Sequence, residues 1–293
     1  FADTLLRNDL KNRKTKAWKE RTHFLRWDLK TARIQWSVKL DEAAGSKADR
    51  YTHYLGYVGP VGDGSKRWFA LRQAAPGKAN MFIAQVKLMG LDPAKKKVDY
   101  SHSFQIGPSP VKFIASRLRT WASPDGQFFV FAEYHEKQNP PLKPAPQLHI
   151  LKLADKSLTS LPVPATPYGV AMDVGDSLLV VASNQTARLW VYDLAKGKIL
   201  RKLKAIGKIH LLLRSPDGKQ LFALAHNRKL EIRAWPSLKL ISRKKASQLI
   251  PGQKWLSPEK AAVSLDGLSL VLPPAGAQYG FAEREDAFLL RWQ

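Results

Sequence analysis

The chain is a succession of short apolar runs separated by turn residues. In 214–241, two turns separate three apolar runs of four to six residues each. The run 221–224 is apolar throughout and too short for a helix, which is typical of a buried strand. The run 230–235 alternates apolar and polar positions, which is typical of a strand with one buried face. The pattern therefore predicts a meander of antiparallel strands.

A glycine turn precedes this meander and recurs along the chain. In Pro216-Asp217-Gly218 the proline fixes φ, the aspartate caps its own backbone, and the glycine accepts a positive φ. Related glycines follow one another at intervals of 49, 43 and 49 residues, namely Gly126, Gly175, Gly218 and Gly267. A period of roughly 40–50 residues is typical of the blades of a β-propeller. We expect the four glycines to occupy equivalent turns of successive blades.

The third run of several units ends near a characteristic aromatic pair. The dipeptide Trp27-Asp28 occurs once, and degenerate versions are Tyr192-Asp193, Trp235-Pro236 and Trp292-Gln293. With the spacing and the Ser-Pro-Asp-Gly turns, these pairs make most of 22–293 resemble the WD-repeat family of β-propellers. The family's Gly-His pair before the first strand is missing. Its buried Asp between the second and third strands is replaced by Asn184-Gln185 or His226-Asn227. The resemblance implies a fold more firmly than a function.

Together, the period and the resemblance predict an all-β chain: a β-propeller of four-stranded antiparallel blades, about five to seven in number. The repeats are expected near 51–106, 111–164, 167–205, 209–247 and 255–293, with 23–40 as additional strands. Residues 34–40 are expected to complete the last blade. Because 24–29 are then left over, the chain is expected to be an excerpt of a longer protein that begins before Phe1.

Residues 1–22 form a basic N-terminal segment outside the repeats. Leu5, Leu6, Leu10 and Trp18 fall on a loose apolar stripe, and most of the other residues are charged or polar. Two interpretations remain open, a helix that caps the propeller or a flexible basic arm.

The net charge of +24 is unevenly distributed. Residues 186–258 contain seventeen Lys and Arg but three acidic residues, and the first forty residues contain eleven basic and four acidic ones. A field of this size attracts polyanions in a salt-dependent way. The alternative is a basic surface that only keeps the protein in solution. Because the fourth strand of a blade lies at the rim, we expect one solvent-facing patch from Lys196, Lys198, Arg201, Lys202, Lys204, Lys208, Arg243, Lys244 and Lys245.

Sites for catalysis, metals or cofactors are not predicted. The chain has no cysteine, which excludes disulfides, thiolate metal sites and cysteine nucleophiles. Its seven histidines show neither the i,i+4 nor the His-x-His spacing that zinc sites favour. The densest polar group, Glu133, His135 and Glu136, is expected to lie in a solvated Pro-rich loop. The stretch 59–66 superficially resembles a phosphate loop, but a predicted strand follows it where a helix is required, so we expect a hairpin turn.

Three functional hypotheses follow. The leading one is a non-enzymatic scaffold that binds a protein partner. The second is a basic subunit of a nucleic-acid-bound or ribonucleoprotein assembly that contacts phosphates through its rim. A propeller enzyme is disfavoured, because no constellation of carboxylates or histidines is apparent. No apolar run approaches the roughly 18 residues of a membrane span, so we expect a soluble protein, with the cytoplasm favoured.

Overall fold

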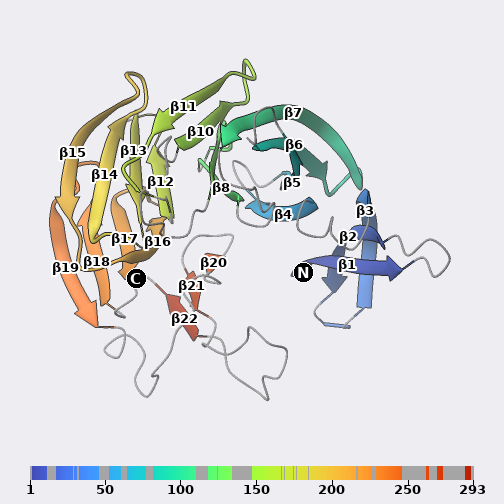
Figure 1. Cartoon of the computed structure of the whole chain (residues 1–293). Coiled ribbons are helices and arrows are strands. Elements are labelled where there is room, and N and C mark those ends of the chain that lie inside the picture. Colours follow the sequence, from blue (N-terminus) through green and yellow to red (C-terminus); the bar gives the residue numbers. More distant parts are fainter. Residues whose placement is uncertain are drawn as a thin grey trace. The chain divides into compact units, whose positions relative to one another are not determined.

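The structure, a computed structural model, describes residues 2–11, 18–28, 30–31, 33–45, 53–60, 65–76, 82–109, 118–123, 125–133, 147–165, 167, 169–173, 175, 177–183, 185–215, 217–225, 229–245, 262–263, 269–272 and 288–291. The regular elements within these residues are β-strands (Figure 1). The chain divides into two compact units. The first is Phe1–Phe131 with Leu142–Pro144 and Leu151–Leu158, and the second is Ala132–Pro141, Ala145–Ile150 and Thr159–Gln293.

Four of the sheets have four strands each. Two of them contain β4 (His53–Pro60), β5 (Arg67–Pro76), β6 (Phe82–Asp92) and β7 (Lys97–Ser109), and β8 (Leu118–Ala122), β9 (Phe128–Glu133), β10 (Gln147–Lys152) and β11 (Leu158–Pro162). The other two contain β12 (Gly169–Asp173), β13 (Leu178–Ala182), β14 (Arg188–Asp193) and β15 (Lys198–Lys204), and β16 (Ile209–Arg214), β17 (Gln220–Ala225), β18 (Lys229–Ala234) and β19 (Leu240–Lys245). In each sheet the strands follow one another in chain order, as short turns between strands require.

Two further sheets have three described strands each. They contain β1 (Ala2–Lys11), β2 (Trp18–Asp28) and β3 (Arg33–Gly45), and β20 (Ala262–Val263), β21 (Ser269–Leu272) and β22 (Phe288–Arg291). Among the residues described, no helix is long and apolar enough to cross a membrane.

The N-terminal segment differs from its sequence prediction. The helix or flexible arm expected within 1–22 is wrong, because β1 and the first part of β2 occupy it and pair antiparallel along their whole length. The register sets Leu5 opposite Phe24 and Leu10 opposite Lys19. Apolar residues at 5, 6 and 10 fit neither a strict helical nor a strict strand period, so pairing with β2 decides the conformation.

β3 belongs to the first sheet, so the expected pairing of 34–40 with the last blade is wrong. β3 pairs with β2 across a tight turn at Lys30 and Thr31. The Asp28 carboxylate accepts hydrogen bonds from the backbone N–H groups of these two residues, at 2.8 and 3.3 Å. This capped turn keeps β3 beside the strand that precedes it in the chain.

Two of the glycine turns are held by the same set of bonds. In each, the Gly N–H donates to the Ser carbonyl at 2.9 Å, and the Asp carboxylate accepts from the Ser hydroxyl and from the N–H two residues further on. The residues are Ser123, Asp125 and Gly126, and Ser215, Asp217 and Gly218. The glycines have φ of 72° and 70° respectively, which explains why glycine stands there. The Ser215 hydroxyl is the main cause that lowers the pKa of Asp217.

The third glycine of this set, Gly175, lies between β12 and β13, the place that Gly126 and Gly218 take in their own sheets. Gly267 lies outside the described residues.

Four strands at sheet edges carry a bulge at the same place, close to their start. Near the start of each of β3, β7, β15 and β19 the register skips one residue. The extra residues are Gln35, Asp99, Leu200 and Ile241. A bulge bends its strand and increases the local twist, and its recurrence shows that these strands are equivalent parts of a repeat.

The core of the second unit fills the space between the sheets β12–β15 and β16–β19. Val180, Val191, Leu221 and Ala223 are fully buried members of one apolar cluster. Gly169 of β12 approaches β16 so closely that an added Cβ would lie 3.1 Å from the backbone N of Leu212. Close packing of this kind fixes the two sheets against each other.

Each of these two sheets also sends a long side chain back to the strand that ends the preceding sheet. The Tyr192 hydroxyl donates to the carbonyl of Pro162, the last residue of β11, at 3.2 Å. The Arg233 guanidinium donates to the carbonyl of Lys204, the last residue of β15, at 2.9 Å. Tyr192 and Arg233 hold the same register position in their sheets, opposite Leu179 and Leu221. The sheets of the second unit are thus linked by a repeated polar contact.

In the first unit, aromatic side chains fill the core. Trp68 packs against Phe129 and Tyr100, with ring centroids 4.9 and 5.2 Å apart, and Phe104 meets Phe131 edge to face at 5.0 Å. All five belong to one apolar cluster or are packed against it.

Candidate functional site

β15 is exposed along nearly its whole length. Lys198, Arg201, Lys202 and Lys204 are all exposed, and Leu203 is half-buried. Only one side of β15 pairs with a neighbour, because β15 ends the order of its sheet among the described strands. The cations of β15 are therefore presented to solvent.

β19 presents a second copy of this arrangement. Arg243, Lys244 and Lys245 are exposed at its end. In the register, Lys202 lies opposite Trp190 on β14, and Arg243 lies opposite Glu231 on β18. Lys204 and Lys245 end the two strands at matching positions. Lys202 and Lys204 on β15 are therefore equivalent in position to Arg243 and Lys245 on β19.

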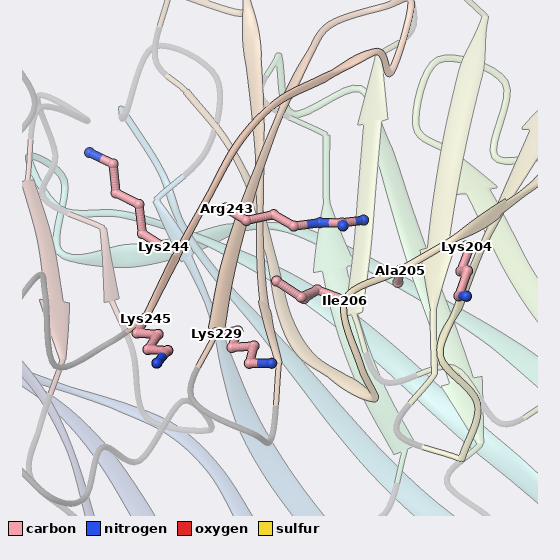
Figure 2. Close-up of a pocket in the computed structure, with 7 residues that line it drawn as sticks. All are labelled: Lys204, Ala205, Ile206, Lys229, Arg243, Lys244 and Lys245. Carbon is pink, nitrogen blue, oxygen red and sulfur yellow. The ribbon is translucent and has the colours of Figure 1, made fainter.

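A groove of about 510 Å³ brings the end of β15 together with β19. Figure 2 shows its lining, which is Lys204, Ala205, Ile206, Lys229, Arg243, Lys244 and Lys245. Four residues of the predicted patch thus share one groove. The other five do not line it: Lys196, Lys198, Arg201, Lys202 and Lys208.

Arg201 and Lys196 of the predicted patch contact other groups of the protein. The Arg201 guanidinium donates to the carbonyls of Pro236 and Ser237, at 3.2 and 2.8 Å. Lys196 forms an ion pair with Asp193 at 3.7 Å. Arg201 therefore connects β15 to the turn between β18 and β19, and its charge is partly used within the protein.

Two further cations belong to this surface and were not predicted from the sequence. Lys229 is the first residue of β18 and lies opposite Lys245. Arg188 is the first residue of β14 and lies opposite Lys204. In a meander, the start of the third strand lies opposite the end of the fourth. A basic residue at the start of a third strand is therefore expected to lie beside the basic end of the fourth strand, and this expectation identifies both Arg188 and Lys229 from the sequence.

A buried acidic residue lies beside the groove. Glu231 is fully buried and forms an ion pair with Arg233, whose guanidinium also donates to the carbonyl of Leu238 at 2.8 Å. Arg243 Nε lies 3.7 Å from Glu231 Oε2, too far for a hydrogen bond. Arg233 is thus the close partner of this carboxylate, and Arg243 stands between it and the groove.

Exposed apolar residues lie at the bulged end of both strands. Ile199 and Leu200 on β15 are 37% and 53% exposed, and Leu240 and Ile241 on β19 are 38% and 53% exposed. The register makes Ile199 equivalent to Leu240, and Leu200 equivalent to Ile241. An apolar pair, followed by a cationic end, is thus repeated on two neighbouring sheets of one unit.

The histidines are dispersed. The buried His149 shares a hydrogen bond of 2.9 Å between Nδ1 and the Ser160 hydroxyl. Burial, followed by the charge of Lys156, lowers the pKa of His102. His135 and Glu136, from the loop considered above, lie outside the described residues. Within the part of the chain that the structure describes, no group of three or more His, Asp or Glu is placed to hold a metal ion.

The stretch 59–66, which resembles a phosphate loop, connects two paired strands. β4 includes Gly59 and Pro60, β5 begins at Arg67, and the two strands are antiparallel. Lys66 forms an ion pair with Asp99 at 3.0 Å. A helix N-terminus, which a phosphate loop requires, does not follow this stretch.

Comparison with known proteins identifies the fold. No family model matches the sequence, and no curated protein matches it significantly. The β-propeller domain of Cps50 (Swd1) from Myceliophteria thermophila is similar in structure, with a TM-score of 0.53 and 15% identity, over 98% of this chain and 84% of that one. Hydrazine synthase from Kuenenia stuttgartiensis gives a TM-score of 0.48 and 14% identity, over 81% of this chain and 64% of that one. The first likeness confirms the prediction of an all-β chain with the WD40 type of β-propeller fold.

Proposed function

We propose that this chain is a non-enzymatic interaction scaffold that binds a protein partner through the bulged ends of β15 and β19. Propellers of the WD40 type commonly serve as platforms for protein binding. The observation that carries the proposal is the repeated apolar pair, Ile199-Leu200 and Leu240-Ile241, exposed at equivalent positions on two neighbouring sheets.

The chemistry of these ends suits an interface. Branched apolar side chains that stand in solvent release water when a partner covers them, which favours association. Exposed cations adjoin both pairs: Lys198 on β15 and Lys239 just before β19. A partner segment with apolar side chains flanked by acidic residues matches this surface, and the charges steer its approach.

The test exchanges the two most exposed apolar residues, Leu200→Ser with Ile241→Ser. We expect affinity purification with the full chain to capture an acidic partner that the double variant fails to capture. With the purified partner, calorimetry is expected to show at least about a tenfold loss of affinity, since losing two buried branched side chains costs at least about 1.4 kcal/mol.

Ile34→Ser is the matched control. Ile34 is 50% exposed and holds the position equivalent to Ile199, beside the bulge of β3 in the first unit. The control should bind like the parent, and circular dichroism should show all three proteins folded. Equal binding by the parent and the double variant would contradict the proposal, as would turnover of a substrate by the purified chain.

A further inference from the structure

We propose that the groove between the end of β15 and β19 binds the phosphate backbone of a nucleic acid. The groove begins at Lys204, four residues along β15 from Leu200, which is about 13 Å in an extended strand. On β19 the groove begins at Arg243, two residues from Ile241. None of the four residues of the apolar pairs lines the groove, so this inference does not depend on the proposed protein partner.

The first observation is a pair of like charges, repeated. Arg188 lies directly opposite Lys204, and Lys229 lies directly opposite Lys245. Like charges directly opposite each other destabilise the pairing of two strands. The chain places such a pair at the same register position of two neighbouring sheets. An anion bound between the side chains would offset the repulsion within each pair.

The second observation is the composition of the groove. Five of its seven lining residues are cations, and the other two are Ala205 and Ile206. Among the described residues, no acidic side chain lines it. The nearest carboxylate described, that of Glu231, is buried and already paired with Arg233. The groove therefore presents net positive charge to any ligand that enters it.

The directions of the side chains favour a polymer over a compact phosphate. Figure 2 shows Arg243 extending toward the segment with Ala205, whereas Lys244 extends to the opposite side of β19. Lys229 and Lys245 lie near each other at another end of the lining. These donors do not converge on one point, as the clamp for a single phosphate requires. A backbone that runs across the two strands would meet them in succession.

The groove also lacks the means to read bases. No aromatic side chain is among its lining residues in the described part of the chain, so bases have no surface on which to stack. Lysine contacts to phosphates fix a nucleic acid without reading its sequence. The binding should therefore be independent of sequence and strongly dependent on salt.

The test neutralises the two like-charge pairs together, with Arg188→Gln, Lys204→Gln, Lys229→Gln and Lys245→Gln. Arg243 is kept, because it contacts the Glu231 carboxylate. The control neutralises four exposed lysines elsewhere, with Lys30→Gln, Lys97→Gln, Lys156→Asn and Lys219→Gln. Asn is used at 156 because that residue has a φ of 58°, which Asn tolerates. Both variants carry the same net charge.

The measurement is a fluorescence titration of a generic DNA duplex against the full chain at several salt concentrations. Each lost phosphate contact lowers the slope of log affinity against log salt by roughly 0.9, so the groove variant should lose about 3 to 4 from the slope of the parent. Its affinity should fall at least about tenfold at low salt. The control variant should keep most of the slope and most of the affinity of the parent. Circular dichroism should show that the groove variant and the control variant are both folded under the conditions of the titration.

Competition experiments separate the sources of negative charge. Polyglutamate and vesicles of phosphatidylserine and phosphatidylcholine are added at equal salt, each against the labelled duplex. The proposal expects an unlabelled duplex to compete better than either. It is overturned if the groove variant keeps the slope and affinity of the parent, if the two variants lose equally, or if polyglutamate or the vesicles compete better than nucleic acid.

Discussion

The sheets β12–β15 and β16–β19 share one backbone plan but support it with opposite chemistry. At two matching register positions the first sheet has Trp190 and Tyr192, and the second has Glu231 and Arg233. All four are buried. Both sheets nevertheless form the same bulge in the next strand. In both sheets a large side chain thus occupies the same position and donates to the carbonyl of the last residue of the preceding sheet. The chemical type of that side chain differs between the two sheets.

The cost of the two solutions differs. A buried Trp and Tyr need only hydrogen-bond acceptors for one N–H and one hydroxyl, and carry no charge that must lose its hydration. A buried ion pair must offset the loss of hydration of both charges, so each partner depends on the other. The sheet β16–β19 is therefore expected to be the more sensitive of the two to a single substitution, and the following predictions test that difference.

The largest effect is expected for Glu231→Ala. This change leaves the buried Arg233 without its carboxylate, which should lower the free energy of unfolding by about 3–5 kcal/mol. Urea denaturation of the variant and the parent, followed by circular dichroism, measures the difference.

The double variant Glu231→Leu with Arg233→Met serves as its control. Replacing a buried ion pair by apolar residues of similar volume is often neutral, so the double variant should be more stable than Glu231→Ala. If the double variant is less stable than Glu231→Ala, the ion pair itself stabilises the sheet. The ion pair would then not be interchangeable with the buried Trp190 and Tyr192 of the neighbouring sheet.

A second effect concerns pH and the aromatic sheet. Burial raises the pKa of Tyr192 to about 12, from its ordinary value of 10.0. Between these values the unfolded chain has lost this proton while the folded chain retains it, so folding stability should fall as pH rises from about 10 to about 12. The contribution is roughly 2 kcal/mol at pH 12.

Tyr192→Phe removes this group and leaves all other titrating residues in place. Unfolding midpoints measured across this pH range should therefore fall more steeply for the parent than for the variant as pH rises. If the two curves stay parallel, the Tyr192 hydroxyl is not buried as described.

The smallest effect is expected for Arg201→Ala. The guanidinium of Arg201 links β15 to carbonyls in the turn before β19, and its loss should cost about 1 kcal/mol, since the side chain is exposed. Ser242 holds the matching position on β19, and Ser242→Ala should change stability by less than about 0.5 kcal/mol. Thermal unfolding of both variants measures the difference in stability. Equal losses for the two variants would show that Arg201 does not link the two sheets.

The strands of the second unit were predictable because their signals are local. A run such as 221–224, bounded by Gly218 on one side, has the length and the apolar content of a buried strand in isolation. The positive φ of Gly218 follows from the same local chemistry. The N-terminal segment was not predictable, because β1 forms through its pairing with β2, and its own apolar spacing fits no single period.

The candidate site was only partly predictable for a related reason. The cations at the end of β15 and in β19 stand in basic runs that the sequence displays directly. Arg188 and Lys229 stand outside those two strands in the sequence and join the site through the register of β14 and β18. The buried Glu231 likewise looks like an ordinary polar position of an alternating strand. Its burial depends on packing between two sheets, which no local pattern contains.

The recurring bulge has a consequence for association between copies of this chain. β15 and β19 each end the order of their sheets, so one side of each has no neighbouring strand among the described residues. Such an edge is a template for pairing with another copy and for the growth of aggregates. The bulge interrupts the even ladder that an incoming strand would need, and the lysines beyond it would face the lysines of any second copy aligned in the same way. The edges can therefore remain open in a crowded solution without joining to one another.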